Sequence, residues 1–484
     1  MRITRSGPLD PTTRRAAARR TPSPWRAAKP LVASAVLALG GTSWGADISE
    51  IYAEAIANDP VLARARASYE ISRTGVTAAR ASLLPQVSAS ASRRTGTTSV
   101  DAIDMNPNSP NFGRTRPDTE TTSQSWGASV NQQVLNLGSW FGYRGAQADS
   151  NRADWDLQTA SQLLITRVAQ AYLNVLSRQA ELESAIAAEE AVQRQLEQVQ
   201  QRFDVGLEAI TGVLESKAAY DSAVVTRIRA ESQQRVSFEA LRTLTGTAYG
   251  EIADLKEDLA IVDPLPNDEE EWVRTAMETN SGIRSAQQAL ASAEHSVRSN
   301  MSQYLPTVSA GASYGTNSGQ ASVQGIILPD QGTSTSVGYS FNFQMPLFQG
   351  MRTQANVKRA RLSRDLARHS LIEQELNVAE QVRTRFRLVV TDVVAVAASA
   401  EALKSAQAAL EATQTGYEVG TRNIVDVLRA QQDVFRSEYQ YNLSRHTYVL
   451  DMLRLKESAG TLSESDIQEL NSNIDAGNPV QKAP

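Results

Sequence analysis

The amino-acid sequence contains two copies of one long unit. Residues 202–210 recur 214 residues later as residues 416–424, each copy with a central Val-Gly pair. Residues 84–89 return at 305–310, and residues 135–138 return at 347–350, with offsets of 221 and 212 residues. Solenoid repeats are much shorter, at roughly 20 to 50 residues. The chain is therefore expected to contain an internal two-fold repeat of a whole structural layer.

Each copy is expected to contain one very long helix. Residues 138–203 and 350–417 contain no proline, so each run predicts a helix of about 65 residues and about 100 Å. At five of six positions spaced by seven, both runs have an apolar residue, which indicates coiled-coil packing. The positions are Val168, Val175, Leu182, Glu189, Leu196 and Phe203 in the first run, and Val382, Val389, Val396, Leu403, Leu410 and Tyr417 in the second.

Shorter helices are expected on either side of each long one. A Val-Gly pair ends each long run, and a return helix should follow over residues 210–244 and 424–458. Two more helices are expected over residues 48–84 and 269–305, before the repeated Leu-Pro pairs.

An alternation with a period of two predicts strands between these helices. Over residues 336–345, Val337, Tyr339, Phe341 and Phe343 alternate with polar or small residues, and Trp126 and Val130 belong to the matching segment of the first half. Ten alternating residues match one membrane-spanning strand, with these six side chains facing lipid. A soluble hairpin sheet with one wet face has the same alternation and remains the alternative.

Four strands are expected in all, and they cannot close a barrel within one chain. Because open sheet edges are not tolerated in lipid, several copies would have to combine. The expected organisation is a signal peptide at 1–45, repeat 1 at 46–245, a connector at 246–268, repeat 2 at 269–460 and a polar tail at 461–484. The strands are placed at about 85–97, 123–135, 306–316 and 334–347.

The first 45 residues have the composition of a secretory signal peptide. Eight basic residues precede a short apolar run over residues 31–40, and small residues follow near Gly45 and Ala46. A disordered basic tail is the alternative. Cleavage would change the net charge from −5 to about −12, which disfavours non-specific nucleic-acid binding. No later run is long and apolar enough for a transmembrane helix.

The sequence offers no constellation for catalysis, for a metal or for another cofactor. Cysteine is absent, and His295, His369 and His446 are isolated from one another. No Gly-Lys pair supplies a phosphate-binding loop. The chain is therefore not expected to be an enzyme, and energy for any transport would come from a partner.

These features resemble the TolC family of outer-membrane channels. The resemblance covers residues 55–462, and its most specific segments are residues 201–211 and 416–428. It implies a mainly α fold with a membrane β-barrel portion. Three copies would each give four strands to a homotrimeric 12-stranded barrel in the outer membrane of a Gram-negative bacterium. A long α-helical barrel would continue it into the periplasm.

The resemblance also implies a function and partners. The chain would be the exit channel of a tripartite export system, for type I protein secretion or small-molecule efflux. It would work as a passive duct, opened by a periplasmic adaptor (membrane fusion) protein and an inner-membrane ABC, RND or MFS transporter. The alternative is a periplasmic coiled-coil adaptor or scaffold without a barrel.

A periplasmic gate is expected at the turns that follow the long helices. By resemblance, Tyr417, Arg422 and Thr211 match gate positions, and Asp426 matches an acidic ring. Gly212 replaces the aspartate that pairs with the arginine in close family members, and either Glu208 or Glu215 could supply the missing acid. Arg429 stands where a second acidic ring would be. It would lower cation selectivity if it faces the lumen, or it points at a neighbouring helix.

Overall fold

The computed structural model describes residues 45–99, 102–109, 112–114, 118–256, 258–323, 326–328 and 332–483. All described elements belong to one compact unit, Trp44–Pro484. The signal peptide expected at residues 1–45 lies outside the described residues, except for Gly45, and stays a prediction.

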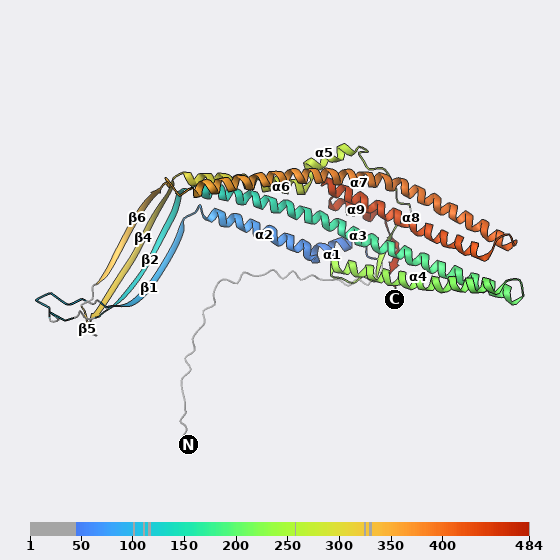
Figure 1. The fold of residues 1–484 in the computed structure, drawn as a ribbon, viewed down its shortest axis with the longest axis horizontal. Helices are drawn as coiled ribbons and strands as arrows, with labels where there is room; N and C mark the ends of the chain where they lie inside the picture. The colour runs from blue at the N-terminus through green and yellow to red at the C-terminus, as the bar shows by residue number, and fades with distance from the viewer. Residues whose placement is uncertain are drawn as a thin grey trace, which may run out of the picture. The chain divides into compact units, whose positions relative to one another are not determined.

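The same order of elements occurs twice in this unit (Figure 1). The first half contains α1 (Ile48–Asn58), α2 (Pro60–Ala81), β1 (Gln86–Thr98), β2 (Thr119–Leu135), α3 (Leu137–Asp204) and α4 (Ile210–Thr245). The second contains α5 (Glu269–Thr279), α6 (Ser281–Met301), β4 (Thr307–Val323), β6 (Thr333–Gln344), α7 (Arg352–Glu418) and α8 (Ile424–Ala459). The long helices have 68 and 67 residues, and each return helix has 36, which confirms the internal repeat.

The helices predicted over residues 48–84 and 269–305 are each divided in two. Asp59 and Asn280 have extended backbone at the breaks, with ψ of 118° and 121°. Each also caps the next helix, because Asp59 accepts a hydrogen bond from the Leu62 N–H and Asn280 from the Ile283 N–H. At Asp59 the following proline further disfavours helical backbone. The short 3-10 helix η1 (Ser302–Tyr304) follows α6.

The connector and the C-terminal tail contain structure that the sequence does not predict. In the connector, β3 (Glu251–Leu255) pairs antiparallel with β7 (Ile474–Gln481) of the tail. The tail also forms α9 (Glu464–Ser472). It folds back because Ile467, Leu470 and Ile474 enter the main apolar core. The segment at 461–484 is therefore not merely a polar tail.

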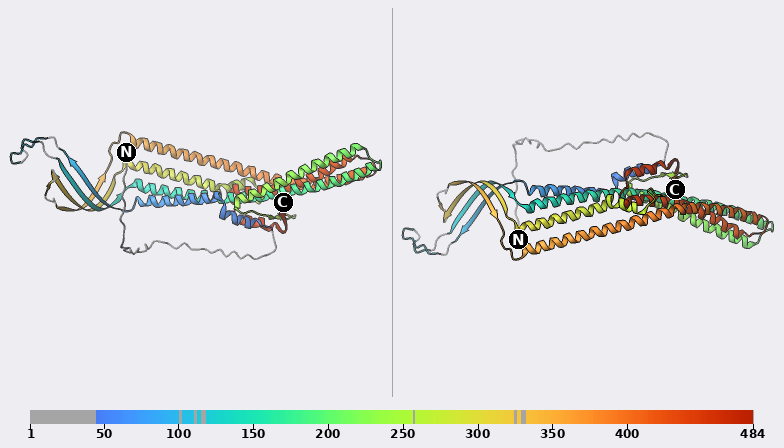
Figure 2. Two further views of the ribbon diagram at one scale, coloured as in Figure 1. Left: turned by 90° about the horizontal axis from the view of Figure 1, so that it is seen from below. Right: turned by 90° about the horizontal axis from the view of Figure 1, so that it is seen from above.

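The predicted heptad positions of each long helix are largely buried against neighbouring helices. The side chains of Val382 and Val389 are fully buried, as are those of Val168 and Val175. The polar exception is Glu189, whose carboxylate accepts a hydrogen bond from Arg227 Nε of α4 at 2.5 Å. Helix α3 packs against α4, α6 and α8, and α7 packs against α6 and α8. Both hairpins, α3–α4 and α7–α8, extend away from the sheet (Figure 2).

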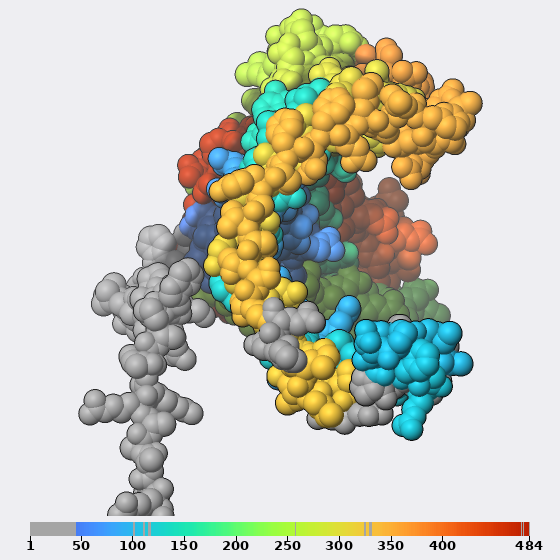
Figure 3. Space-filling model, turned by 90° about the vertical axis from the view of Figure 1, so that its left-hand side faces the viewer, coloured from blue at the N-terminus to red at the C-terminus, as the bar shows by residue number. Residues whose placement is uncertain are grey.

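The main sheet has the antiparallel order β1-β2-β4-β6, with the two-residue β5 (Ile326–Ile327) beside the end of β4. Val87 lies opposite Val130, Val130 opposite Ala312, and Ala312 opposite Tyr339. Apolar residues therefore occupy one face across all four strands. β2 and β4 extend farther toward the loops than predicted. The sheet lies at one end of the helices and faces the viewer in Figure 3.

Replacing Asp59 with alanine should destabilise the protein by about 3 kcal/mol, because it breaks a largely buried ion pair and removes a helix cap. The Asp59 side chain is 1% exposed and accepts a hydrogen bond from Arg167 Nη1 at 2.9 Å. We expect a lower urea midpoint for the loss of helical circular dichroism in detergent. The control Glu70→Ala removes an exposed pair with Arg73 and should cost less than about 0.5 kcal/mol. Equal midpoints for the two variants would contradict this.

Candidate functional site

The two turns at the far end of the helical hairpins form the first candidate site. Each long helix ends at a Val-Gly pair, and Gly206 and Gly420 have φ of 77° and 80°. This left-handed backbone favours glycine, which explains why both copies keep it. The return helices begin four residues later, at Ile210 and Ile424.

The return helices begin with different caps. At α8, Asn423 and Asp426 form a capping box, in which the Asp426 N–H donates to Asn423 Oδ1 at 2.9 Å. At α4 the corresponding residue is Ala209, which has no side chain that can accept such a bond. A missing polar cap costs about 1 kcal/mol. The start of the first return helix is therefore held less firmly than that of the second.

Tyr417 joins the two turns. Its side chain is 6% exposed, and its hydroxyl donates a hydrogen bond to Glu208 Oε2 at 3.3 Å. The guanidinium carbon of Arg202 lies 4.9 Å from the centre of the Tyr417 ring. Burial raises the pKa of Tyr417, so its phenol keeps its proton. An apolar cluster surrounds it, made by Val192, Val199, Val213, Ile424, Val427 and Leu428.

Gly212 makes room for the Glu208 side chain. A Cβ atom at position 212 would lie only 2.9 Å from Glu208 Oε1. Glu208 thus approaches the place where the resemblance leads us to expect an aspartate, whereas Glu215 is exposed. Of the two acids left open by the sequence, the structure brings Glu208 to Tyr417. It does not bring Thr211 there, because Thr211 is exposed at the start of α4.

The other predicted gate residues lie on the exposed side of the second turn. Arg422 Nη1 is 3.9 Å from Asp426 Oδ2, one helical turn away, in a weak exposed pair. Arg429 is also exposed, and no residue in the described part of the chain forms an ion pair with it. Arg202 was not predicted as a site residue. Its place next to Phe203 in the duplicated segment was the available signal.

The exposed sheet is the second candidate site. Its apolar face includes all six residues predicted to face lipid, and all six are exposed: Val337, Tyr339, Phe341, Phe343, Trp126 and Val130. Tyr339 is 86% exposed. The opposite face is rich in serine and glycine, and the Ser88 and Ser129 hydroxyls hydrogen bond across β1 and β2 at 2.9 Å. A soluble protein rarely exposes a contiguous apolar face of this kind.

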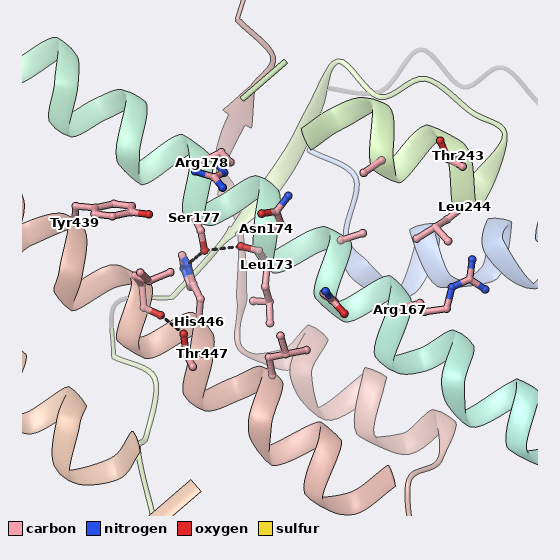
Figure 4. Close-up of a pocket in the computed structure, with 15 residues that line it drawn as sticks. Arg167, Leu173, Asn174, Ser177, Arg178, Thr243, Leu244, Tyr439, His446 and Thr447 are labelled. Atoms are coloured by element: carbon pink, nitrogen blue, oxygen red, sulfur yellow. Dashed lines mark hydrogen bonds between the residues drawn. The ribbon is translucent and has the colours of Figure 1, made fainter. Parts of the chain in front are cut away.

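A cavity of about 680 Å³ lies between α3, α4 and α8 (Figure 4). Inside it, Ser177 Oγ lies 2.8 Å from both His446 Nδ1 and the Leu173 carbonyl. Because the carbonyl can only accept, the serine proton points toward Leu173, and His446 donates to the serine. Burial lowers the pKa of His446 to about 4, so the ring is neutral. This contact does not activate the serine as a nucleophile.

The described residues contain no group of three His, Cys, Asp or Glu side chains arranged to hold a metal ion. None of their helices is both long and apolar enough to cross a membrane.

Comparisons with known proteins agree with this architecture. The model of the family "Outer membrane efflux protein" matches residues 51–247 and 272–461. Outer membrane protein TolC of Vibrio cholerae is 31% identical over 448 residues, which cover 92% of this chain and 98% of TolC. Alkaline protease secretion protein AprF of Pseudomonas aeruginosa is 26% identical over 430 residues, covering 88% of this chain and 87% of AprF.

A solved structure shares the fold. The Campylobacter jejuni CmeC outer membrane channel superposes with a TM-score of 0.69 and 18% sequence identity, covering 88% of this chain and 90% of CmeC. The family match spans both repeats, and the long hairpins and the sheet both belong to the shared region. The chain therefore belongs to the outer membrane efflux protein family and is an exit channel of the outer membrane of a Gram-negative bacterium.

Proposed function

We propose that the channel is a homotrimer in which three copies build one twelve-stranded barrel, continued by a helical tunnel in the periplasm. The observation that carries this proposal is the four-stranded sheet. It has an exposed apolar face, and among the described residues β1 and β6 each have only one neighbouring main strand. Unpaired strand edges are not tolerated in lipid, so other copies must pair with them.

The strand directions suit such closure. Because β1, β2, β4 and β6 alternate in direction, β6 of one copy can pair antiparallel with β1 of the next. Three copies would then give an even number of strands and no free edge. The resemblance to TolC-type channels supports three as the number of copies. In this barrel the apolar face contacts lipid and the serine-rich face lines the lumen.

The helices also have complementary unpartnered edges. On α7, Leu362, Leu366 and Leu376 are exposed along one face, and Leu366 is 70% exposed. On α2, Ile71 is exposed between the exposed Ala67 and Ala78. Within one chain α2 packs against α3, and α7 packs against α6. An exposed apolar edge on each helix supports packing between neighbouring copies.

The proposed role is that of a passive duct in a tripartite export system. A periplasmic adaptor and an inner-membrane ABC, RND or MFS transporter would select the cargo and supply the energy. The exposed Val205, Leu207 and Ile210 at the first turn give the adaptor an apolar contact surface. AprF is named for protein secretion and the family model for efflux, so both cargo classes remain within the proposal.

A periplasmic adaptor or scaffold without a barrel is the competing function. It would share the long hairpins but would gain nothing from an exposed apolar sheet. The sheet therefore favours the channel.

Replacing Phe341 with lysine should reduce barrel assembly strongly, because a lysine in the middle of the lipid face costs about 2–4 kcal/mol per copy. The matched control Asn342→Lys lies next to it on the polar face and should assemble normally. The measurement is the amount of heat-modifiable trimer in the outer-membrane fraction. Equal yields for both variants would favour the scaffold without a barrel.

For the gate, we propose that Glu208 replaces the missing aspartate at position 212. The Glu208–Tyr417 hydrogen bond holds the first turn against the second, with Arg202 packed over the tyrosine ring. A hydrogen bond to a charged acceptor contributes about 1.5 kcal/mol, which is about a tenfold effect on an opening equilibrium. In the trimer, Asp426, Arg422 and Arg429 would line the constriction formed by the turns.

Removing this hydrogen bond should favour the open gate. We expect Glu208→Gln and Tyr417→Phe each to raise the single-channel conductance in planar bilayers several-fold, because each weakens the contact between the turns. Glu215→Gln, at an exposed acid on the same helix end, is the control and should conduct like the wild type. The proposal fails if Glu215→Gln opens the channel and Glu208→Gln does not.

Arg429→Asp should make the channel more cation-selective. Three Asp426 carboxylates attract cations, and an arginine one helical turn away offsets that charge. The reversal potential in a potassium chloride gradient measures the effect. Arg242→Asp makes the same charge change at the far end of α4 and should leave the reversal potential near the wild-type value. An unchanged potential in Arg429→Asp would mean that Arg429 faces away from the lumen.

A further inference from the structure

The serine-rich face of the main sheet carries a single charged side chain among the described residues. In β1, Arg93 and Arg94 are adjacent and therefore point to opposite faces. Arg93 lies opposite Gln124, in the alternation that continues Ala91 and Trp126 on the apolar face. Arg94 lies opposite Ser123, in the alternation that continues Ser92 and Ser125 on the serine-rich face.

The rest of that face is uncharged. β2 contributes Thr121, Ser123, Ser125, Gly127, Ser129 and Asn131, β4 contributes Ser309, Gly311, Ser313, Gly315, Asn317 and Gly319, and β6 contributes Ser334, Ser336, Gly338, Ser340, Asn342 and Gln344. The four strands contain one acid, Glu120, which lies opposite Thr97 on the apolar face. Asp104, Arg114 and Asp118 are the described charged residues of the β1–β2 loop.

The guanidinium of Arg94 is uncovered. Its neighbours across the sheet are Ser123 and then Gly319, and an added side chain at Gly319 would meet open space. Arg94 is exposed, and no described residue forms an ion pair with it. An arginine keeps its charge at any physiological pH. Its positive charge can therefore interact with solutes that move along this face.

We propose that Arg94 is a specificity-determining residue that favours anionic cargo at the outer mouth of the channel. This rests on the proposed trimeric barrel, in which the serine-rich face lines the lumen. Three copies place three guanidinium groups at one level, on the loop side of the apolar band that ends near Trp126. Because the described residues place no acid on this face of the four strands, the ring attracts anions and repels cations.

The test is block of the current by a small polyanion, inositol hexakisphosphate, added on the side of the β1–β2 loop. In 0.1 M KCl the Debye length is about 10 Å, so a ring in the lumen still acts on a blocker inside it. We expect Arg94→Glu to raise the half-blocking concentration about tenfold or more. Arg94→Lys keeps the positive charge, so its half-blocking concentration should equal that of the wild type. Arg93→Glu, the matched control on the lipid face, should change the value less than twofold.

A second measurement tests the same inference if the Arg94→Glu variant does not assemble. The chain has no cysteine, so Arg94→Cys and Arg93→Cys each carry one thiol that can be modified after assembly. A cationic methanethiosulfonate attached at position 94 should restore the block by inositol hexakisphosphate, and an anionic one should abolish it. Neither reagent should change the block when it is attached at position 93. The inference is overturned if position 94 has no effect, or if both positions act equally. A wild-type protein that forms no conducting trimer would instead overturn the proposed function.

Discussion

A β-sheet in lipid must pair every backbone group, and this requirement accounts for much of the molecule. The chain supplies four strands in alternating directions and leaves β1 and β6 open at the edges. In the proposed trimer further copies close the sheet, and the helices that follow the strands would then stand side by side around a common axis. The heptad seam of α3 and α7 suits this, because it lets helices of nearly 70 residues pack lengthwise without one globular core.

The repeat, the long helices and the strand pattern could be predicted because each depends on periodicity along the chain. The seam positions Val382 and Val389 are buried as that periodicity requires. The breaks at Asp59 and Asn280 were missed because each depends on one or two residues, a capping residue and at Asp59 also the proline that follows, within an otherwise helical pattern. The pairing of β3 with β7 was missed for a different reason. It joins short segments more than 200 residues apart, and no local pattern reports such a contact.

The contacts at the candidate gate also could not be predicted from local sequence patterns. The sequence indicates that an acidic side chain has been lost at position 212, because Gly212 stands where an aspartate is expected. In the structure Glu208 reaches Tyr417 from four residues earlier, beside a glycine that leaves room for its side chain, and the proposed gate uses this contact. Spacing along one helix could name Glu208 and Glu215 as candidates. Only the packing of one hairpin against the other separates them, and the role of Arg429 depends on neighbouring copies.

The β3–β7 pair has a consequence for the history of the chain. A tandem duplication yields two similar units on one polypeptide, and in principle each could later separate and be inherited alone. Here a strand of the tail that follows the second unit pairs with a strand that lies just after the first unit, and Tyr172 of α3 hydrogen bonds to the Ala253 carbonyl of that strand. The pairing of the tail with the connector would therefore be lost if either half were inherited alone.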